Sequence, residues 1–435
     1  MANFNNSTKT KSVCNVCHRK IPAETFQKNG KILIKKRCEQ HGSFISDHIW
    51  DDPEIFQRFS ETKSIETDPA QMSIILTYRC NMDCPVCLAN ANKLDIPDFN
   101  VKDFKRIDHY KSILLTGGEP TIRKDLPQII NFLRKKKKKV VMLSNGIKLA
   151  DRSYVRLLKQ SGLSCVRLQF DSLDDQDNIY MRGKKCFSTK EAAIKNLEDY
   201  KIPIILSAVM LKNKSFRGME KLFNFAFKHP RIRMISVNPL WKLGRYNEED
   251  FVPSSKIIQE ADRILGLKKR DWIESTILLV NLDKLLSIFT KRRRFFCMCN
   301  VKCLLIRQKN SFIPITRIFN VKKINEKIEN IYQSKGLAKK LGILTALLAN
   351  QLVVNFFTNK NFRFLLGKML SNSKYLLKRD YLLLNPFYYL SVESFMATEN
   401  FDFNVGSKCN LHGYFPGDPV PRPACLNRIN LMEKE

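Results

Sequence analysis

The chain has 435 residues, of which 75 are Lys or Arg and 42 are Asp or Glu, so its formal net charge is +33. Its 44% hydrophobic and 27% charged residues are typical of a folded protein and exclude an intrinsically disordered one. This length exceeds one ordinary core, so we expect two or three domains. The charge favours a polyanionic partner, either nucleic acid or an anionic membrane face, although Lys-rich surfaces also occur without one.

Composition divides the chain into three zones. Residues 1–68 carry Cys and His residues and predict a small N-terminal metal-binding domain. Residues 69–262 alternate apolar runs with amphipathic stretches and predict the central core. Residues 263–435 combine basic clusters, cysteines and a long apolar-basic stretch, and predict a mostly helical, cysteine-bearing C-terminal domain.

The N-terminal residues lack the apolar segment of a signal peptide, so we expect a cytoplasmic protein. Its 13 cysteines are then expected to be reduced, and metal binding outranks disulfides. The longest uncharged stretch, 341–359, contains Thr, Asn and Gln residues and is a poor membrane span.

Six short apolar runs in the central zone predict buried parallel strands. They cover residues 73–77, 112–116, 140–144, 165–170, 204–210 and 234–238. Helix-like segments lie between them at 124–138, 151–161, 188–200 and 216–228. This alternation indicates an α/β fold, a partial (β/α)6 barrel open on one side, with functional residues at the carboxyl ends of the strands.

A cysteine motif follows the first strand directly. Cys80, Cys84 and Cys87 have the spacing C-x3-C-x2-C. Three thiolates fit three irons of a [4Fe–4S] cluster and leave the fourth iron open to the amino and carboxylate groups of S-adenosylmethionine (SAM). The alternatives are three reduced cysteines in a loop, or a zinc site that lacks its fourth ligand, since no further Cys or His follows closely.

Polar and glycine-containing segments follow the next three strands. We expect them to bind SAM, with the Glu119 carboxylate accepting from its ammonium group; turns and helix N-caps are the alternative interpretation. The candidate residues are Gly117, Gly118, Glu119, Pro120, Ser144, Asn145, Gln169, Asp171 and Arg182.

With the cysteine triplet and the GGEP segment, residues 70–260 resemble the radical SAM superfamily. The resemblance implies reductive cleavage of SAM to a 5′-deoxyadenosyl radical, with reduced ferredoxin or flavodoxin as electron donor. Val86 stands where the superfamily often has an aromatic residue before the third cysteine.

Further segments resemble archaeal tetraether lipid synthases and their relatives, long described as pterin methyltransferases. These segments are CPVCLANA (84–91), NPLWKLGR (238–245), SFIPITRIFNVKK (311–323) and the terminal block 395–427. The last block reads PVPRPAC where these relatives have an apolar strand, and the chain is short for the group.

Two further groups of cysteines predict metal sites. Cys14, Cys17, Cys38 and His41 form two knuckles suited to tetrahedral zinc or mononuclear iron; the resemblance favours iron, and unmetallated cysteines are the alternative. The second group predicts one auxiliary [4Fe–4S] cluster with four of its five thiols as ligands, or partly structural cysteines. Its members are Cys297, Cys299, Cys303, Cys409 and Cys425.

The leading functional hypothesis is hydrogen abstraction from an unactivated carbon, on a lipid tail, with C–C bond formation or a related modification. An anionic lipid substrate and peripheral association with the inner membrane face would match the +33 charge. The apolar-basic stretch 335–395 would then line an apolar channel, or else form core helices with basic edges.

Two other functions stay open: radical C-methylation of a pterin or other small molecule, and a nucleic-acid-binding or RNA-modifying role. The basic runs lack the interleaved aromatic residues that base stacking needs, which makes nucleic acid the weaker partner. An apolar groove at the open side of the barrel would favour the lipid. A compact polar pocket there would favour the pterin, and a basic stripe on one outer face would favour RNA.

Overall fold

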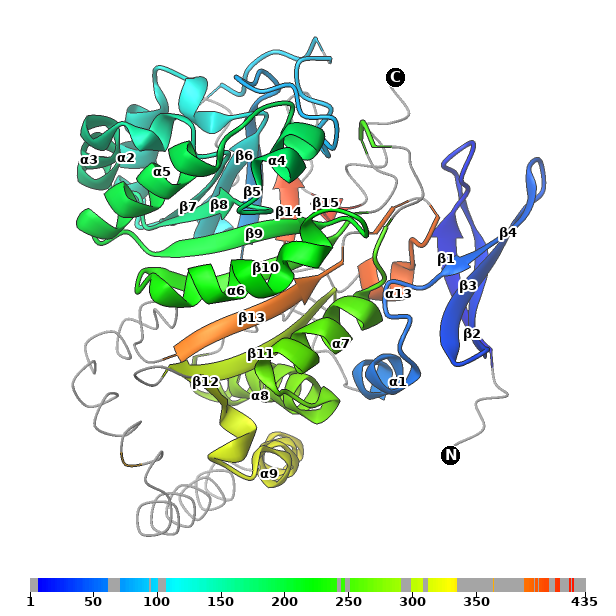
Figure 1. Ribbon diagram of the computed structural model, residues 1–435. Coiled ribbons are helices and arrows are strands. Elements are labelled where there is room, and N and C mark those ends of the chain that lie inside the picture. Colours follow the sequence, from blue (N-terminus) through cyan, green and yellow to red (C-terminus); the bar gives the residue numbers. More distant parts are fainter. Residues whose placement is uncertain are drawn as a thin grey trace.

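Figure 1 shows the computed structural model of the chain. The structure describes residues 7–61, 71–93, 95–100, 107–240, 244–246, 251–290, 299–307, 312–334, 363, 387–394, 396–397, 399–406, 411–414, 422–423 and 425.

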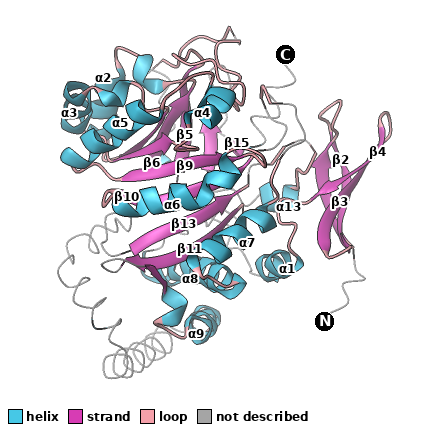
Figure 2. Cartoon of the chain, viewed as in Figure 1, coloured by secondary structure: helices cyan, strands magenta, loops and turns pink. Residues whose placement is uncertain are grey.

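The N-terminal region is a four-stranded antiparallel sheet, ordered β1 to β4, followed by helix α1. The strands are β1 (Thr8–Val13), β2 (Lys20–Lys28), β3 (Lys31–Cys38) and β4 (Gly42–Asp47), and the helix is α1 (Pro53–Glu61). Asn29 and Gly30 have positive φ angles of 50° and 73°, which suits the two-residue turn between β2 and β3. This sheet stands apart from the larger one in Figure 2.

Six parallel strands form the centre of the large sheet and follow one another in chain order. They are β5 (Gln71–Thr77), β6 (Ser112–Gly117), β7 (Lys139–Ser144), β8 (Cys165–Gln169), β9 (Ile204–Met210) and β10 (Ile232–Pro239). Each of the six expected runs therefore forms a strand, and the partial barrel is confirmed.

Helices connect these strands and cover the outer face of the sheet (Figure 1). They are α2 (Leu126–Lys135), α3 (Arg152–Ser161), α4 (Asp175–Arg182), α5 (Phe187–Asp199) and α6 (Met219–Lys228). The caps of α3 show why the chain folds so: the Asp151 carboxylate accepts from two backbone N–H groups of the first turn, and Gly162 ends the helix at φ 105°.

The two faces of the sheet differ in burial. Outward-facing residues such as Val166, Leu168 and Ile204 have no exposed surface, because the helices pack on them. Several inward-facing residues, including Arg167 and Gln169, are only half-buried. An inner apolar layer lies near the amino ends of the strands. It contains Leu114, Val141, Cys165, Ile205 and Met234. Cys165 is therefore a core residue.

The C-terminal zone continues the same sheet across the expected boundary at 262/263. Its described helices are α7 (Ser254–Leu265), α8 (Lys269–Thr290), α9 (Val321–Gln333) and α13 (Phe403–Gly406). Its strands are β11 (Asn300–Arg307), β12 (Phe312–Pro314), β13 (Phe387–Glu393), β14 (Leu411–Tyr414) and β15 (Arg422–Pro423). The sequence predicted a mostly helical C-terminal zone. Its described part contains these helices, and it also contains strands that join the barrel sheet.

These strands extend both edges of the barrel. Strand β13 pairs in parallel with β10, and β11 pairs antiparallel with β13. On the other edge, β14 pairs in parallel with β5. The backbone groups of the two barrel edges thereby gain hydrogen-bonding partners from the end of the chain. None of the helices in the described part of the chain is long and apolar enough to cross a membrane.

The N-terminal sheet docks on the segment just after β13 (Figure 1). Thr10 donates to the Asp402 carboxylate at 2.5 Å, and Ser12 donates to the carbonyl of Phe401 at 2.5 Å. His48 lies 3.3 Å from the other Asp402 oxygen. Residues about 350 to 390 positions apart in the sequence therefore hold the first domain against the segment after β13.

Candidate active site

The loop after β5 brings three cysteine thiols together at the carboxyl end of the barrel. Cys80, Cys84 and Cys87 are half-buried. Burial and the neighbouring charges of Glu119, Cys84 and Cys87 raise the pKa of Cys80 to about 11. The charges of these thiols affect one another, and three neighbouring thiolates repel one another unless a positively charged centre lies between them. The thiols thus fit the three protein ligands of an iron–sulfur cluster, as the spacing predicted.

The GGEP segment packs directly on this loop. Gly117 has φ 142°, and a Cβ there would collide with the backbone of Thr77; a Cβ on Gly118 would collide with the carbonyl of Arg79. The N–H of Glu119 donates to the same carbonyl at 3.0 Å. The two glycines therefore allow the chain to approach its own cysteine loop closely.

Glu119 links the ends of two strands. It is 1% exposed, and its carboxylate accepts four hydrogen bonds. These come from the backbone N and Oγ1 of Thr121, from Ser144 Oγ and from the backbone N of Asn145. Burial raises its pKa, and these bonds counteract the shift. The carboxylate therefore orders the loops after β6 and β7, and its contact with the ammonium of SAM stays a prediction.

Asn145 reaches from the end of β7 to the cysteine loop. Its side-chain amide lies 3.9 Å from Cys80 Sγ and donates to the side chain of Asn81 at 2.8 Å. The loop after β6, the loop after β7 and the cysteine loop therefore form one continuous hydrogen-bonded unit.

A second carboxylate, Asp171 after β8, organises the other side of the site. Arg182 at the end of α4 donates to both of its oxygens, at 2.7 and 2.9 Å, and the N–H of Val209 donates at 2.9 Å. Burial alone would raise the pKa of Asp171. The opposite effect of the Arg182 charge is larger, so the pKa stays below its ordinary value. The charge of Arg182 also lowers the pKa of Cys84 against the effect of burial, so Arg182 links Asp171 electrostatically to the cysteine loop.

The side chain of Gln169 lies below this pair. It donates to Asp171, and its carbonyl accepts from the buried Lys190 of α5 at 2.6 Å. Three residues that the sequence selected, Gln169, Asp171 and Arg182, therefore lie in one hydrogen-bonded network. Lys190 also belongs to this network, although the sequence analysis did not select it.

Arg245 is a site residue that sequence reasoning did not select. Its guanidinium donates to Asp83, to the carbonyls of Cys84 and Ala91, and to the side chain of Asn90. Its backbone N–H donates to the carbonyl of Cys87 at 3.0 Å. A residue about 160 positions downstream therefore fixes the part of the cysteine loop between residues 83 and 91 by hydrogen bonds. The Gly-Arg pair at 244–245 was visible in the sequence, but only the fold reveals its partner.

An apolar group lies beside the cysteine loop. Val86 packs with Met181, Leu211, Leu240 and Tyr246. The position that often carries an aromatic residue in the superfamily therefore lies in a buried apolar cluster, which joins the cysteine loop to α4 and to the segments after β9 and β10.

The N-terminal cysteines and His41 also converge. Among the residues that the structure describes, they form a group whose four ligand atoms all lie within 4.8 Å of one another. His41 Nδ1 lies 3.6 Å from Cys14 Sγ and 3.4 Å from Cys38 Sγ, and the thiols of Cys17 and Cys38 are 3.9 Å apart. A tetrahedral zinc with Zn–S bonds of about 2.3 Å needs ligand separations of about 3.8 Å, so the set fits a metal.

The C-terminal cysteines are only partly described. Cys297 and Cys409 lie outside the described residues. Cys303 is completely buried on the outer face of β11, and burial together with the charges of Asp271 and Asp262 raises its pKa well above the ordinary value. That environment suits a protonated core cysteine. Cys425 is buried and Cys299 is half-buried, and an auxiliary cluster among these residues stays a prediction.

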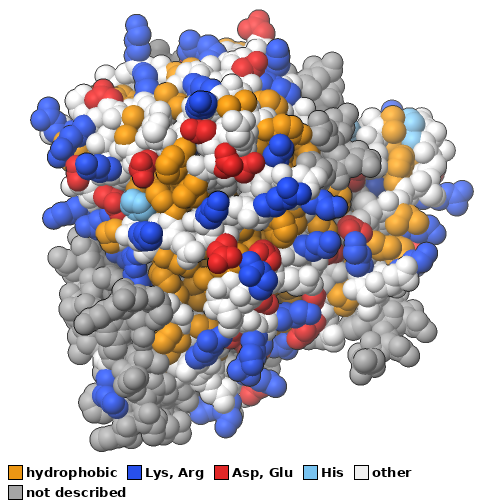
Figure 3. Space-filling view, in the orientation of Figure 1, with side chains coloured by type: hydrophobic (Ala, Val, Ile, Leu, Met, Phe, Trp, Pro, Cys, Tyr) orange, Lys and Arg blue, Asp and Glu red, His pale blue; other side chains and the backbone are white. Residues whose placement is uncertain are grey.

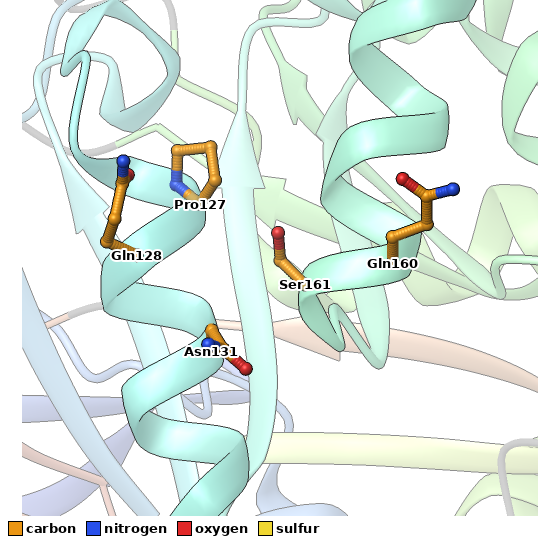
Figure 4. A pocket seen from close by; sticks show the side chains of 5 residues that line it. All are labelled: Pro127, Gln128, Asn131, Gln160 and Ser161. Carbon is orange, nitrogen blue, oxygen red and sulfur yellow. The ribbon is translucent and has the colours of Figure 1, made fainter.

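A surface depression between α2 and α3 plays no part in this site. Figure 4 shows it lined by Pro127, Gln128, Asn131, Gln160 and Ser161. None of these side chains is ionisable, and the helices lie on the outer face of the barrel, so we assign it no chemistry.

Comparison with known families agrees with this geometry. Residues 74–226 match the radical SAM superfamily. The chain carries a radical SAM domain. Residues 7–51 match the HMPTM N-terminal zinc ribbon domain, which covers the four-ligand group described above. The radical SAM domain accounts for the cysteine loop, the partial barrel and the need for a [4Fe–4S] cluster and SAM.

Proteins similar to this chain include enzymes of several activities. The chain is 27% identical to the 7,8-dihydro-6-hydroxymethylpterin dimethyltransferase of Methanocaldococcus jannaschii, over 98% of this chain and 94% of the relative. It is 31% identical to the Fe-coproporphyrin III synthase of Methanosarcina barkeri, over 36% and 41% of the two chains. The crystal structure of Streptococcus suis SuiB bound to SAM is 22% identical, with a TM-score of 0.39 over 46% and 48% of the chains.

Proposed function

We propose that this radical SAM enzyme modifies a carbon of a polar small molecule, and that its reaction is C-methylation of a reduced pterin or a related heterocycle. Likeness to a dihydropterin dimethyltransferase along almost the whole chain supports this choice. The N-terminal match to the HMPTM zinc ribbon supports it independently of the barrel.

The observation that carries the proposal is the polarity of the inner face of the barrel. An ion pair between Arg167 and Glu393 crosses this face, with a nitrogen–oxygen distance of 2.5 Å. Ser207 and Ser236 also face inward. Placing an alkyl chain against this pair would strip water from two charges without replacing its hydrogen bonds. A polar substrate would replace them.

The lipid tail favoured by the sequence stays an alternative prediction. It rests on the net charge and on the stretch 335–395, most of which lies outside the described residues. Figure 3 shows Lys and Arg side chains spread among Asp and Glu on the visible face, without a single basic stripe. That face therefore gives no support to the RNA-modifying alternative.

The protein residues of the site have separate tasks in this proposal. Cys80, Cys84 and Cys87 would hold a [4Fe–4S] cluster, which would supply the electron for cleavage of SAM to methionine and a 5′-deoxyadenosyl radical. Asn145 and Arg182 orient the ends of the cysteine loop. We expect the Asp171–Arg182 pair to contact polar groups of SAM. A reductant such as reduced ferredoxin or flavodoxin would first reduce this cluster.

The N-terminal site has a structural task. Its four ligands come from two turns at one end of a small sheet, so a bound zinc or iron ion would fasten these turns together. The ligand set of three thiols and one imidazole leaves no open position for a substrate. We therefore assign the ion to domain stability and place the chemistry in the barrel.

The experiment that tests the proposal is anaerobic turnover with SAM, a reductant and candidate substrates. We expect 7,8-dihydro-6-hydroxymethylpterin to increase 5′-deoxyadenosine formation and to gain mass in steps of one CH2 unit. An archaeal-type diether lipid in mixed micelles serves as the competing substrate. Stimulation by the lipid with no change in the pterin would contradict the proposal.

A further inference from the structure

Arg167 and Glu393 form an ion pair across the inner face of the sheet. Arg167 is central in β8, and Glu393 is the last residue of β13. Strands β9 and β10 lie between them. Strands are spaced by about 4.8 Å, so the two backbones are about 14 Å apart across the strands. Glu393 also lies further toward the carboxyl end than Tyr389, which is the β13 residue in register with Arg167. The two long side chains therefore bridge over the intervening strands on the concave side.

Small side chains lie beneath this bridge. Ser207 of β9 and Ser236 of β10 are paired in register, and both face inward. Arg167 Nη2 donates to Ser236 Oγ at 2.7 Å as well as to Glu393 at 2.5 Å. The bridge is thus fixed from the strand below, and its other edge faces the interior of the barrel.

The bridge runs obliquely from the apolar layer toward the carboxyl end of the barrel. Arg167 is in register with Ile205, which belongs to that layer. Glu393 follows Val392, the partner of Val237, and so lies beside Asn238. Closer to the cysteine loop lie Asp171 and Arg182. The pair therefore forms a charged floor directly below the end of the barrel that holds the cysteines.

Both members of the pair keep hydrogen-bonding capacity. A guanidinium has five N–H donors, and the described hydrogen bonds of Arg167 both leave from Nη2. A carboxylate has about four acceptor positions, and the described donors to Glu393 are Arg167 Nη2 and, at 3.5 Å, Ser391 Oγ. The charges of Arg167 and Lys302 hold the pKa of Glu393 below its ordinary value, although burial alone raises it. Glu393 is therefore an ionised acceptor at neutral pH.

Stability alone gives no reason for this arrangement. A buried ion pair is often neutral or unfavourable compared with apolar residues of the same volume. The side chains are 19% and 9% exposed, so the pair lies between the dry layer and the solvated end. An acceptor and a donor in that position suit a ligand that offers both.

We infer that Arg167 and Glu393 form the substrate-binding floor of the barrel and recognise a planar heterocycle with an amino-pyrimidinone edge. The Glu393 carboxylate accepts from the ring N–H and the adjacent amino group, and Arg167 donates to the ring carbonyl or a ring nitrogen. The inference deepens the proposed function and rests on it. A lipid tail or a ring without these groups would leave both charges without ligand contacts.

The test measures binding of 7,8-dihydro-6-hydroxymethylpterin to the full-length, cluster-loaded protein under anaerobic conditions, by calorimetry. The variants are Glu393→Gln, and the double variant Arg167→Gln/Glu393→Gln, which leaves no lone buried charge. Glu198→Gln is the matched control, because Glu198 pairs with His229 on the outer side of the barrel. SAM affinity and the cluster spectrum report whether the upper site is intact.

We expect both inner-face variants to bind the pterin about tenfold or more weakly, the loss typical of hydrogen bonds to a charged group. SAM affinity and the spectrum should stay unchanged, and the control should bind as wild type. Unchanged pterin binding by the folded variants would overturn the floor assignment and leave the proposed function standing. Absence of pterin binding by the wild-type protein would overturn the proposed function, and the floor assignment with it.

Discussion

The N-terminal metal site and the cysteine loop of the barrel draw on very different lengths of chain. The four N-terminal ligands span 28 positions, from Cys14 to His41, and lie in two turns of one small sheet. The cysteine loop also has its ligands close together, but its conformation depends on the GGEP segment, Asn145, Arg182 and Arg245.

The difference separates two kinds of metal centre. A local ligand set can close around its ion with little help from the rest of the fold, and the ion then stabilises the domain. A site assembled from many strand ends is rigid before anything binds, which is what a reactive centre needs. We therefore expect disruption of the two sites to separate stability from catalysis.

The largest effect is expected for Cys84→Ala. Loss of one of three thiolate ligands should remove the [4Fe–4S] cluster and abolish the cleavage of SAM to 5′-deoxyadenosine. Iron content, the electron paramagnetic resonance of the reduced protein and product formation measure this. Cys165→Ala is the control, because Cys165 lies in the apolar layer of the barrel. Undiminished cleavage in Cys84→Ala would refute the cluster assignment.

The next effect is expected for Cys38→Ser in the N-terminal site. One metal ion per chain should be lost, and the amides of β1–β4 should exchange faster with solvent, because the metal contributes directly to folding. SAM cleavage without substrate should stay close to wild type. His18→Asn is the control, since its φ of 54° is one that Asn tolerates. Equal loss of SAM cleavage and metal would show that the two sites do not act separately.

A smaller effect is expected for Arg245→Met. The variant loses the side-chain hydrogen bonds that hold the cysteine loop, and the buried acceptors lose their donor. We expect the cluster to form but to be lost to a chelator about tenfold faster. Arg263→Met, at an exposed surface ion pair, is the control. Equal rates of cluster loss in both variants would remove Arg245 from the site.

The smallest effect concerns the docking of the two domains. Burial raises the pKa of Asp402, but its bonds to His48 and Thr10 hold it below the ordinary value. Its contribution to stability is therefore complete above its unfolded value of about 3.9 and is lost as the pH falls through the lower folded value. Proteolysis between the domains should increase below about pH 4 in the wild type. Asp402→Asn should show weakened docking already at neutral pH; protection equal to wild type would contradict this.

The sequence was sufficient for the barrel because burial imposes a simple pattern. Runs such as 140–144 and 204–210 are apolar on both faces or nearly so. The cysteine triplet directly follows β5, the first strand of the barrel. The N-terminal ligands were also predictable, since their spacing requires no knowledge of the fold. Polar residues at strand ends converged as expected because parallel strands end at one edge.

Other features depended on contacts between distant segments. Strands β13 and β14 join opposite edges of the sheet, and no local pattern tells which strand they pair with. Arg167 stands in the middle of the apolar run 165–170, and Glu393 follows another such run. A charge inside a predicted strand was thus the available signal, but only the fold shows that these two charges meet.

The most direct test of the central claim is deuterium transfer into 5′-deoxyadenosine. The protein would be given SAM and a reductant, with either the dihydropterin deuterated at its carbon-bound positions or a lipid with deuterated alkyl chains. We expect deuterium in 5′-deoxyadenosine from the labelled pterin and none from the lipid, with less transfer in Glu393→Gln. Deuterium from the lipid alone would contradict the polar-substrate account.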